Sequence, residues 1–300
     1  GAPVPAGADA VAMVEYTRER DGLVEFREGV RKGANIALRG EDIKKGQKIL
    51  SRGTVIRISH IAALAAVGCG QVKTGALPKV SLINTGGEIV PPGTKLYGNR
   101  IYNSNGPMLS AMLRTDKVCA APVIVRDDAK KMKAALSRAL KTDMLLVSGG
   151  VSMGDYDLVP AVLKSLGVKE IFHNVRVRPG KPMFFGVKGR TLVFGIPGNP
   201  VANFMAYLAY IRPAIRKMGG RPDFAPKFKT GTCAVKFEPR TPRKALVLSK
   251  VSKRAEYALS EVSSNGSADI LALAEANGFT VVEAGGSIKK SGKAAFISWR

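Results

Sequence analysis

The feature that most constrains the fold of this chain is a short apolar run, Met144–Val147, that leads directly into a glycine-rich segment, Ser148–Asp157. Such a run indicates a buried strand, the glycines indicate a ligand loop, and the apolar residues beyond them indicate a helix. In open α/β sheets, ligands lie at the carboxyl ends of the strands. Backbone N–H groups of the glycines can approach an anion, and the helix start adds favourable partial charge. The segment therefore predicts an anion-binding loop, in which Asp155 and Asp157 are carboxylates that could hold a cation.

Three further loops of this kind follow expected strands in the middle of the chain. They are Thr85-Gly86-Gly87-Glu88, Arg178-Pro179-Gly180-Lys181-Pro182 and Pro197-Gly198-Asn199-Pro200. One such loop is a weak signal, because glycine and proline mark turns everywhere. Four loops at corresponding strand ends would meet at one rim of a sheet and bring hydroxyls, backbone donors, two cations and several carboxylates together. This combination suits an anionic ligand with several phosphates and a bound divalent metal.

The pattern of apolar residues divides the chain into three parts. Residues 1–76 indicate a β-rich region with one helix. Residues 77–220 alternate strands and helices, which indicates a parallel sheet with crossover helices. Residues 221–300 alternate apolar and polar residues, as half-buried antiparallel strands do. We therefore expect an α/β multidomain fold: a central three-layer α/β/α domain with a mostly parallel sheet, a β-rich N-terminal part and a small C-terminal β-barrel-like domain.

The individual elements are expected from the same patterns. The expected strands, besides Met144–Val147, are Ala10–Val14, Leu23–Phe26, Val80–Ile83, Cys119–Val125, Val175–Val177, Thr191–Phe194, Thr232–Phe237, Lys244–Lys250, Phe279–Glu283 and Ala294–Trp299. The expected helices are Ser59–Val67, Ser104–Leu113, Asp127–Leu140, Tyr156–Leu166, Val201–Met218 and Ala268–Ala276. Ser59 is the expected N-cap of its helix and Gly68 the expected stop.

Composition narrows the possible functions. The net charge is +24, and residues 77–220 hold 21 basic and 8 acidic residues, so this region should attract anions. Nucleic acid, a small oxyanion and a basic background without a specific role all stay open as explanations of the charge.

The three separated cysteines disfavour a disulfide framework and a zinc site and fit the reducing cytoplasm. No apolar run approaches the about 20 residues of a membrane span, so no membrane partner is expected. The motifs of P-loop nucleotide hydrolysis and nicotinamide binding are absent at these strands.

Taken together, the motifs resemble those of the molybdopterin molybdenumtransferases, the MoeA group that includes the E domain of gephyrin. The segments that carry the resemblance, in this order along essentially the whole chain, are Arg39–Ile43, Thr85–Glu88, Ser148–Asp157, Pro179–Pro182 and Pro197–Pro200. The resemblance implies molybdenum cofactor biosynthesis: insertion of molybdate into adenylylated molybdopterin with release of AMP and with Mg²⁺. It also implies an elongated homodimer, whose active site lies between the molybdopterin-binding domain and the partner subunit's N-terminal part, and a molybdopterin adenylyltransferase as upstream partner.

The resemblance also implies roles for individual residues. Glu88, Asp127 and Asp157 would be catalytic carboxylates and Lys181 a catalytic cation, with Asp127 and Asp157 holding Mg²⁺. The residues that would bind substrate are Thr85, Gly86, Ser148, Gly149, Gly150, Ser152, Arg178, Pro179, Gly180, Pro197, Gly198, Asn199, Arg243 and Ser267. Structural alternatives are open: Asp127 as a helix-start carboxylate that complements the dipole, Ser148–Asp157 as a tight turn, and Arg178 and Lys181 as solvated cations.

The chain also departs from the family pattern. Asn174 and Arg178 stand where lysine is common, and Gly87 stands where the family often has an aspartate. The chain begins at Gly1 without the family's D-G-Y-A segment, so we expect an N-terminally truncated member. The alternative function is therefore a ligand-binding or scaffold module on the same fold, without turnover. A nucleic-acid binder is disfavoured, because the basic residues are dispersed and only 6% of residues are aromatic.

Overall fold

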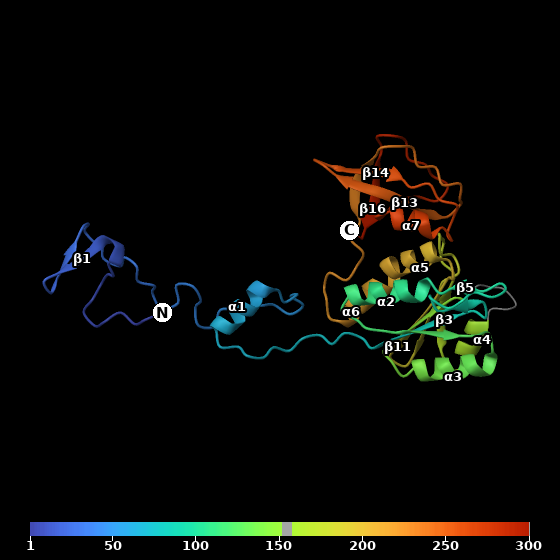
Figure 1. Cartoon of the computed structure of the whole chain (residues 1–300), viewed down its shortest axis with the longest axis horizontal. Coiled ribbons are helices and arrows are strands. Elements are labelled where there is room, and N and C mark those ends of the chain that lie inside the picture. The colour runs from blue at the N-terminus through green and yellow to red at the C-terminus, as the bar shows by residue number, and fades with distance from the viewer. Residues whose placement is uncertain (152–157, 300) are drawn as a thin grey trace. The chain divides into compact units, whose positions relative to one another are not determined.

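The computed structural model describes residues 1–151 and 158–299 and contains two compact units, Gly1–Gln71 and Val72–Arg300 (Figure 1). The first unit holds a short 3₁₀ helix η1 (Val14–Tyr16), the strands β1 (Thr17–Arg20) and β2 (Leu23–Phe26), and the helix α1 (Ile58–Ala66). Its two strands pair in an antiparallel hairpin. The predicted strand Leu23–Phe26 and the helix near Ser59–Val67 are confirmed.

Two details of the first unit correct the sequence-based expectations. Ala10–Val14 is not a strand: Val11 is tied to a loop by single hydrogen bonds, its N–H donating to Ala34 O and its carbonyl accepting from Asn35 Nδ2, so no ladder forms. The N-cap of α1 is Arg57 rather than Ser59, since the Arg57 N–H donates to His60 Nδ1 at 3.2 Å.

The second unit is built on a six-stranded sheet whose strands lie in the order β6 (Pro122–Val125), β3 (Val80–Thr85), β7 (Met144–Ser148), β11 (Thr191–Ile196), β10 (Phe184–Lys188) and β8 (Lys169–His173). The first four strands are parallel to one another, while β10 runs antiparallel to both of its neighbours. The mostly parallel sheet is confirmed. β3, β7 and β11 are buried nearly throughout, which explains why their sequences are mainly apolar.

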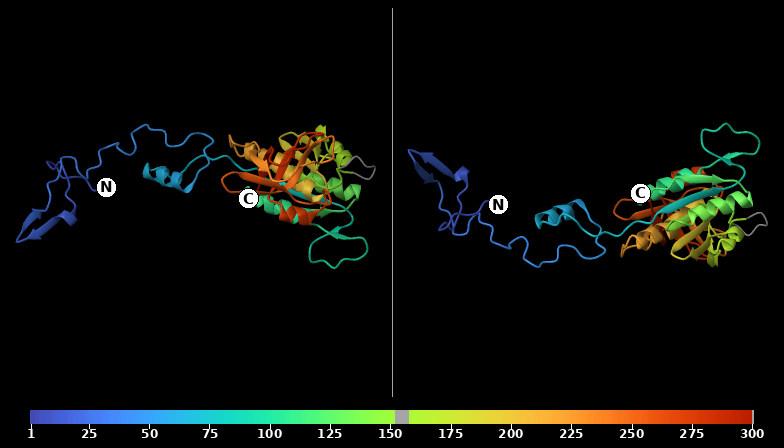
Figure 2. Two further views of the ribbon diagram at one scale, coloured as in Figure 1. Left: turned by 90° about the horizontal axis from the view of Figure 1, so that it is seen from above. Right: turned by 90° about the horizontal axis from the view of Figure 1, so that it is seen from below.

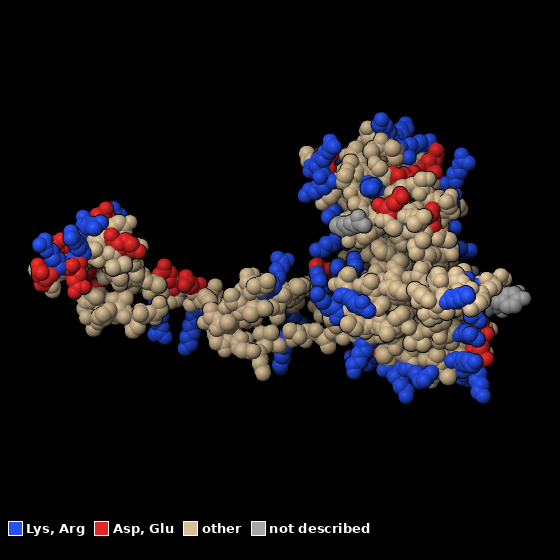
Figure 3. All heavy atoms as spheres, viewed as in Figure 1, with Lys and Arg blue, Asp and Glu red and all other residues tan. Residues whose placement is uncertain are grey.

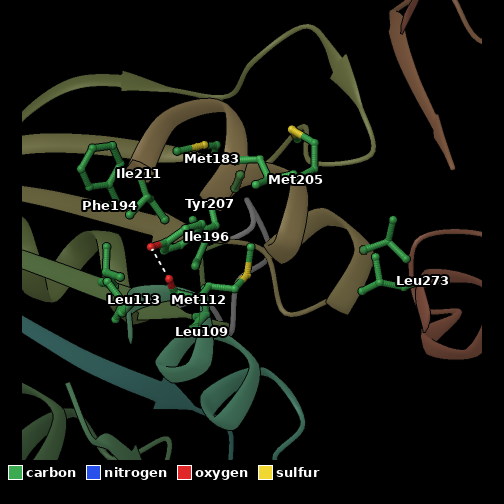
Figure 4. Close-up of a cluster of buried hydrophobic side chains, with 14 of the residues drawn as sticks. Leu109, Met112, Leu113, Met183, Phe194, Ile196, Met205, Tyr207, Ile211 and Leu273 are labelled. Atoms are coloured by element: carbon green, nitrogen blue, oxygen red, sulfur yellow. Dashed lines mark hydrogen bonds between the residues drawn. The ribbon is translucent and has the colours of Figure 1, made fainter. Parts of the chain in front are cut away.

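Helices cover both faces of this sheet and complete the expected three layers. One core cluster joins the sheet to α2 (Asn105–Thr115), α5 (Pro200–Ala206) and α6 (Arg212–Met218). A second cluster joins the other face to α3 (Ala129–Ala139) and α4 (Leu158–Ser165). Figure 4 shows how α2 and the segment after α5 meet in the first cluster, where the Tyr207 hydroxyl lies 2.9 Å from Met112 O.

The long helix expected at Val201–Met218 is present but interrupted. Between α5 and α6 lies the π-helical turn η2 (Tyr207–Ile211), in which the Arg212 N–H donates to Tyr207 O. Pro213 follows within the first turn of α6. A proline inside a helix lacks an N–H and clashes with the carbonyl four residues earlier, and the wider π turn accommodates this.

The C-terminal part of the second unit is a small closed β-barrel, as expected. Its strands are β12 (Lys229–Cys233), β13 (Lys244–Lys253), β14 (Tyr257–Glu261), β15 (Gly278–Val282) and β16 (Lys293–Ser298). The ring closes because β14 pairs with both β12 and β13. The short helix α7 (Ile270–Glu275) packs against β13 and α5.

Two small elements lie beside the sheet and the barrel. β4 (Ile89–Val90) and β5 (Ile101–Tyr102) form a parallel pair, and the segment between them projects from the unit (Figure 2). β9 (Val177–Arg178) pairs with β13 of the barrel. Among the described residues, no helix is both long and apolar enough to cross a bilayer.

Candidate functional site

Two neighbouring cavities collect the loops that the sequence singles out. The first has a volume of about 660 Å³ and the second of about 650 Å³. Both are lined by Pro182, Pro197, Asn199 and Ala268, so the cavities share a wall. The predicted residues in the first cavity are Thr85, Gly86, Glu88, Asp127, Ser148, Gly149, Gly150, Pro197, Gly198 and Asn199. Those in the second are Arg178, Pro179, Gly180, Lys181, Pro197, Asn199, Arg243 and Ser267. Ser152, Asp155 and Asp157 lie outside the described residues.

The expectation that all four loops follow strands of one sheet is wrong for the Arg178–Pro182 loop. This loop follows β9, which pairs in parallel with β13 of the barrel and not with the central sheet. Two arginines fasten it there: Arg178 Nη1 donates to Arg240 O at 2.9 Å, and Arg243 Nη1 donates to Val177 O at 3.3 Å. The site is therefore formed by the rim of the sheet on one side and by the barrel on the other.

The floor of the first cavity depends on two glycines at the end of β7. Gly149 and Gly150 have φ angles of +93° and +63°, which L-residues with a side chain rarely adopt. A Cβ on Gly149 would lie 2.7 Å from the Thr85 carbonyl oxygen, and one on Gly150 would lie 2.9 Å from Thr85 Oγ1. Only glycine lets the β7 loop pass this close to the end of β3. The Gly149 N–H donates to Ile196 O at 3.0 Å, so the Gly150 N–H is the backbone donor that this turn can offer to an anion.

Buried polar atoms point to a polar occupant of the first cavity. Asn84 Oδ1, Thr85 Oγ1 and Asn105 Oδ1 are buried and have no hydrogen-bond partner in the part of the chain that the structure describes. All three residues line the cavity. A buried polar atom without a partner costs about 1–3 kcal/mol, so such a group is usually satisfied by water or a ligand. The lining therefore fits a ligand that brings hydrogen-bond donors to these oxygen atoms.

Two carboxylates lie at the mouth of the first cavity on the loop after β3 and the loop before α3. Asp127 Oδ2 accepts from the Gly87 N–H at 2.8 Å, and the Glu88 carboxylate lies over Gly86, within 2.9 Å of the place where a Cβ would be. Both residues line the same cavity. Carboxylate oxygens are the ligands of hard cations, and Mg²⁺ needs only one or two of them because it keeps several waters. Glu88 and Asp127 therefore fit a magnesium ion that also contacts substrate phosphates, although the residues that the structure describes contain no group of three metal-ligating side chains.

The second cavity is cationic, with four basic side chains around it. They belong to Arg178, Lys181, Arg240 and Arg243. The acidic residue Glu261 also lines the cavity, and burial raises the pKa of its carboxyl group. Such a lining favours a small anion such as a tetrahedral oxyanion.

Asn199 and Ser267 connect the sheet domain to the barrel at the wall between the cavities. Asn199 Nδ2 donates to Ser267 Oγ at 2.7 Å, and the Val201 N–H donates to Ser267 O at 3.1 Å. The loop that carries Ser267 is held in turn by Asp269, whose carboxylate accepts from the Ala272 N–H at 3.0 Å and from the Asn265 N–H at 2.9 Å.

The Asp269 cap leads to a pH-dependent prediction. The backbone N–H of Ala272, and then that of Asn265, hold the pKa of the Asp269 carboxyl below its usual range. Because this pKa is lower in the folded than in the unfolded chain, the stabilisation is present above the ordinary aspartate pKa of about 3.9 and is lost as the pH falls below it. Both carboxylate oxygens of Asp269 accept, whereas asparagine has one acceptor oxygen and no charge. We therefore expect the wild type to melt at a higher temperature than Asp269→Asn at pH 7, and the difference in melting temperature to narrow toward pH 3. Thermal unfolding of both proteins across this range checks it, and a gap that stays constant would contradict it.

Sequence reasoning missed three asparagines at this site. Asn84 lies near the end of β3, Asn105 begins α2 and Asn203 lies in α5, where it is fully buried. A signal was present for Asn203, which is the polar residue of an otherwise apolar run Val201–Ala206. No comparable signal marks Asn84 or Asn105, because asparagine at strand ends and helix starts is common for local reasons.

Comparisons with known proteins identify the family of this chain. A family model described as a probable molybdopterin binding domain matches residues 83–217, and one described as the MoeA N-terminal region (domain I and II) matches residues 1–68. A molybdopterin molybdenumtransferase of Staphylococcus epidermidis is 32% identical over 95% of this chain and 69% of its own length. One of Staphylococcus aureus is 32% identical over 97% of this chain and 70% of its own length.

A solved structure gives the same result for the fold. The molybdopterin biosynthesis moea protein from Pyrococcus horikosii matches with a TM-score of 0.84 and 27% identity, over 100% of this chain and 74% of that one. The sequence relatives exceed 30% identity over nearly the whole chain, and both family models lie where the motifs predict them. The chain therefore belongs to the molybdopterin molybdenumtransferase family, the transferases of molybdenum cofactor biosynthesis.

Proposed function

We propose that this chain inserts molybdate into adenylylated molybdopterin and releases AMP. The observation that carries the proposal is the shared wall of the two cavities, formed by Pro182, Pro197, Asn199 and Ala268. One cavity offers a glycine loop and carboxylates, and the other offers cations. A phosphorylated pterin and a tetraoxyanion can thus be held side by side. This places molybdate next to the pterin that is to receive the molybdenum.

In this proposal the first cavity binds molybdopterin. The Gly150 N–H, the Ser148 hydroxyl and Thr85 contact its phosphate, and Gly86, Gly149, Pro197, Gly198 and Asn199 shape the surrounding wall. Glu88 and Asp127 would hold Mg²⁺, together with Asp157 as a further candidate outside the described residues. When bound there, Mg²⁺ would neutralise negative charge on phosphate oxygens.

The second cavity holds molybdate in this proposal. Arg178, Lys181 and Arg243 compensate its two negative charges, and the Ser267 hydroxyl and the Pro179–Gly180 backbone line its path toward the first cavity. Preorganised cations of this kind lower the barrier most where charge develops. A water molecule cleaves the phosphoanhydride bond of the adenylylated substrate, so that AMP leaves and molybdopterin keeps its phosphate. Molybdate loses one oxygen as water, with the two protons of the dithiolene thiols, as the two sulfurs bind the molybdenum.

Several broader features complete the proposal. We propose three domains, residues 1–76, 77–220 and 221–300, a cytoplasmic location in keeping with three free cysteines, and a molybdopterin adenylyltransferase as the source of substrate.

We also propose a homodimer. Its support is that no residue of Gly1–Gln71 is buried in the structure of this unit, although Val14, Leu23, Leu38 and Ile58 are large apolar side chains. Exposed apolar side chains in such number are typical of an interface.

Replacing one of two adjacent aspartates tests the role of the carboxylates. We expect Asp127→Asn to lower the rate of AMP release by about 10- to 100-fold, because it removes a charge at the mouth of the first cavity while it can still accept from Gly87. The matched control is Asp128→Asn: Asp128 caps α3 by accepting from the Lys131 N–H at 2.7 Å, and asparagine caps equally well. AMP release by the control should equal that of the wild type. Equal rates for both variants would contradict the role of Asp127.

The function itself is tested by incubating the chain with adenylylated molybdopterin, Mg²⁺ and molybdate. AMP release and formation of a cofactor that activates a cofactor-free molybdenum enzyme support the proposal. Substrate binding without AMP release would instead support the ligand-binding or scaffold module.

Nucleic-acid binding gains no support from the surface, since lysines and arginines on the face shown in Figure 3 are spread over both the sheet domain and the barrel.

A further inference from the structure

The hydroxyl of Ser148 is the centre of a small hydrogen-bond network at the end of β7. Ser148 is 3% exposed and lines the first cavity. Its Oγ lies 2.6 Å from Asn203 Nδ2 and 3.4 Å from Asn105 Nδ2. The two asparagines come from α5 and from the first turn of α2, two helices on the same face of the sheet.

The orientation of both asparagine amides is determined by neighbouring carbonyl groups. Asn203 Nδ2 also lies 3.0 Å from Pro197 O, and Asn105 Nδ2 also lies 2.5 Å from Gly198 O. A carbonyl oxygen only accepts, so the amide group facing it must be the NH₂ and not the oxygen. Both asparagines therefore donate to Ser148 Oγ.

In this arrangement the Ser148 hydroxyl has its proton left for a further hydrogen bond. A hydroxyl has one proton and two lone pairs, and here both lone pairs accept from amide groups. Among the described residues, Ser148 Oγ donates no hydrogen bond. A buried hydroxyl whose acceptor capacity is already used can serve a ligand only as a donor, and phosphate oxygens only accept when ionised.

We infer that Asn105 and Asn203 are positioning residues that hold the Ser148 hydroxyl as a donor to a phosphate oxygen of molybdopterin. This inference rests on the proposed function. The two asparagines do not touch the phosphate through this contact; they act by preventing the hydroxyl from rotating and from accepting. The site thereby disfavours a ligand group that can only donate, and it favours an ionised phosphate oxygen, which only accepts and forms the stronger, charge-assisted hydrogen bond.

A double-mutant cycle tests this inference through affinity for molybdopterin, measured by titration calorimetry. Asn105→Ala removes one donor at a part-exposed position, and Asn203→Ala removes the closer one. We expect each to weaken binding several-fold and the pair together about tenfold, the value of one charge-assisted hydrogen bond. In the Ser148→Ala background, neither change should weaken binding further, because the hydroxyl that they orient is gone.

Two controls separate positioning from a loss of structure. Ser110→Ala in α2 also removes a buried hydrogen bond to a backbone carbonyl, that of Ala120 at 2.7 Å, and should lower the melting temperature without changing affinity. Dephosphorylated molybdopterin should bind the asparagine variants and the wild type equally. If Asn203→Ala does not fold, the Asn105→Ala cycle alone decides the question.

The possible outcomes are distinct. Equal losses with and without the Ser148 hydroxyl, equal losses for the dephosphorylated pterin, or unchanged affinity would each overturn the inference while the wild type still binds molybdopterin. A wild type that does not bind molybdopterin would overturn the proposed function, and the inference with it.

Discussion

Gly149→Ala is expected to abolish molybdopterin binding at micromolar concentrations. The substitution places a Cβ 2.7 Å from the Thr85 carbonyl oxygen and does so at a φ of +93°. Strain at such a φ and the clash with backbone each cost about 1–3 kcal/mol, so about 4 kcal/mol must be relieved by moving the loop. A displacement of this kind moves the Gly150 N–H and the Ser148 hydroxyl away from the phosphate and corresponds to about a thousandfold loss of affinity.

Gly189→Ala is the matched control for this substitution. Gly189 lies in the turn between β10 and β11 with a φ of +58°, and a Cβ there would meet no atom within 4 Å. It therefore suffers the same kind of backbone strain without the clash and away from both cavities. We expect a small drop in melting temperature and an unchanged affinity. A similar affinity loss in both variants would show that the Gly149 effect is one of general stability.

Asp116→Ala is expected to produce the largest loss of stability, about 3 kcal/mol in the free energy of unfolding. The Asp116 side chain is 9% exposed and lies 2.7 Å from the Tyr207 hydroxyl and 2.9 Å from Arg212 Nε, with Arg216 Nε at 3.7 Å. Burial, followed by the bond to the Asp116 carboxylate, raises the pKa of the Tyr207 hydroxyl, which stays protonated and donates. Removing the carboxylate leaves two partly buried cations without their counter-charge. Urea unfolding measures the change.

The control for this prediction is an ion pair on the surface of the same unit. Arg221 donates two hydrogen bonds to Asp223, at 2.9 and 2.8 Å, so the geometry is better than at Asp116. The two side chains are 35% and 36% exposed, so water screens this pair more than the pairs of Asp116, and Asp223→Ala should change the unfolding midpoint less than Asp116→Ala does. If Asp223→Ala destabilised the protein as much as Asp116→Ala does, burial would not be the cause of the Asp116 effect.

Much of the central domain could be predicted because its signals are local. Strands β3, β7 and β11 are buried on both faces, so each has an apolar centre, and each is followed by glycine or proline. The sequence pattern does not predict β8 and β14, because they contain charged residues and lie at less buried positions. It does not predict β10 either, because Met183–Val187 directly follows the proline turn, and the pattern does not separate the end of the turn from the start of a strand.

The site was harder to predict than the fold, since it depends on which sheet each strand joins. The sequence of Val175–Val177 does not indicate that β9 pairs with the barrel. Because of this pairing, the cations of the Arg178–Pro182 loop line the second cavity, whereas Glu88 and Asp127 line the first. The hydrogen bonds from Asn105 and Asn203 to Ser148 span 43 and 55 positions of the chain, and only the tertiary structure brings these residues together.

The most direct test of this account is the binding of molybdopterin to the chain, titrated for the wild type and for Gly149→Ala. We predict one molybdopterin per chain for the wild type and no measurable binding for the variant at the same concentration. Absence of binding to the wild type, or equal affinity of the two proteins, would contradict the placement of the substrate in the first cavity.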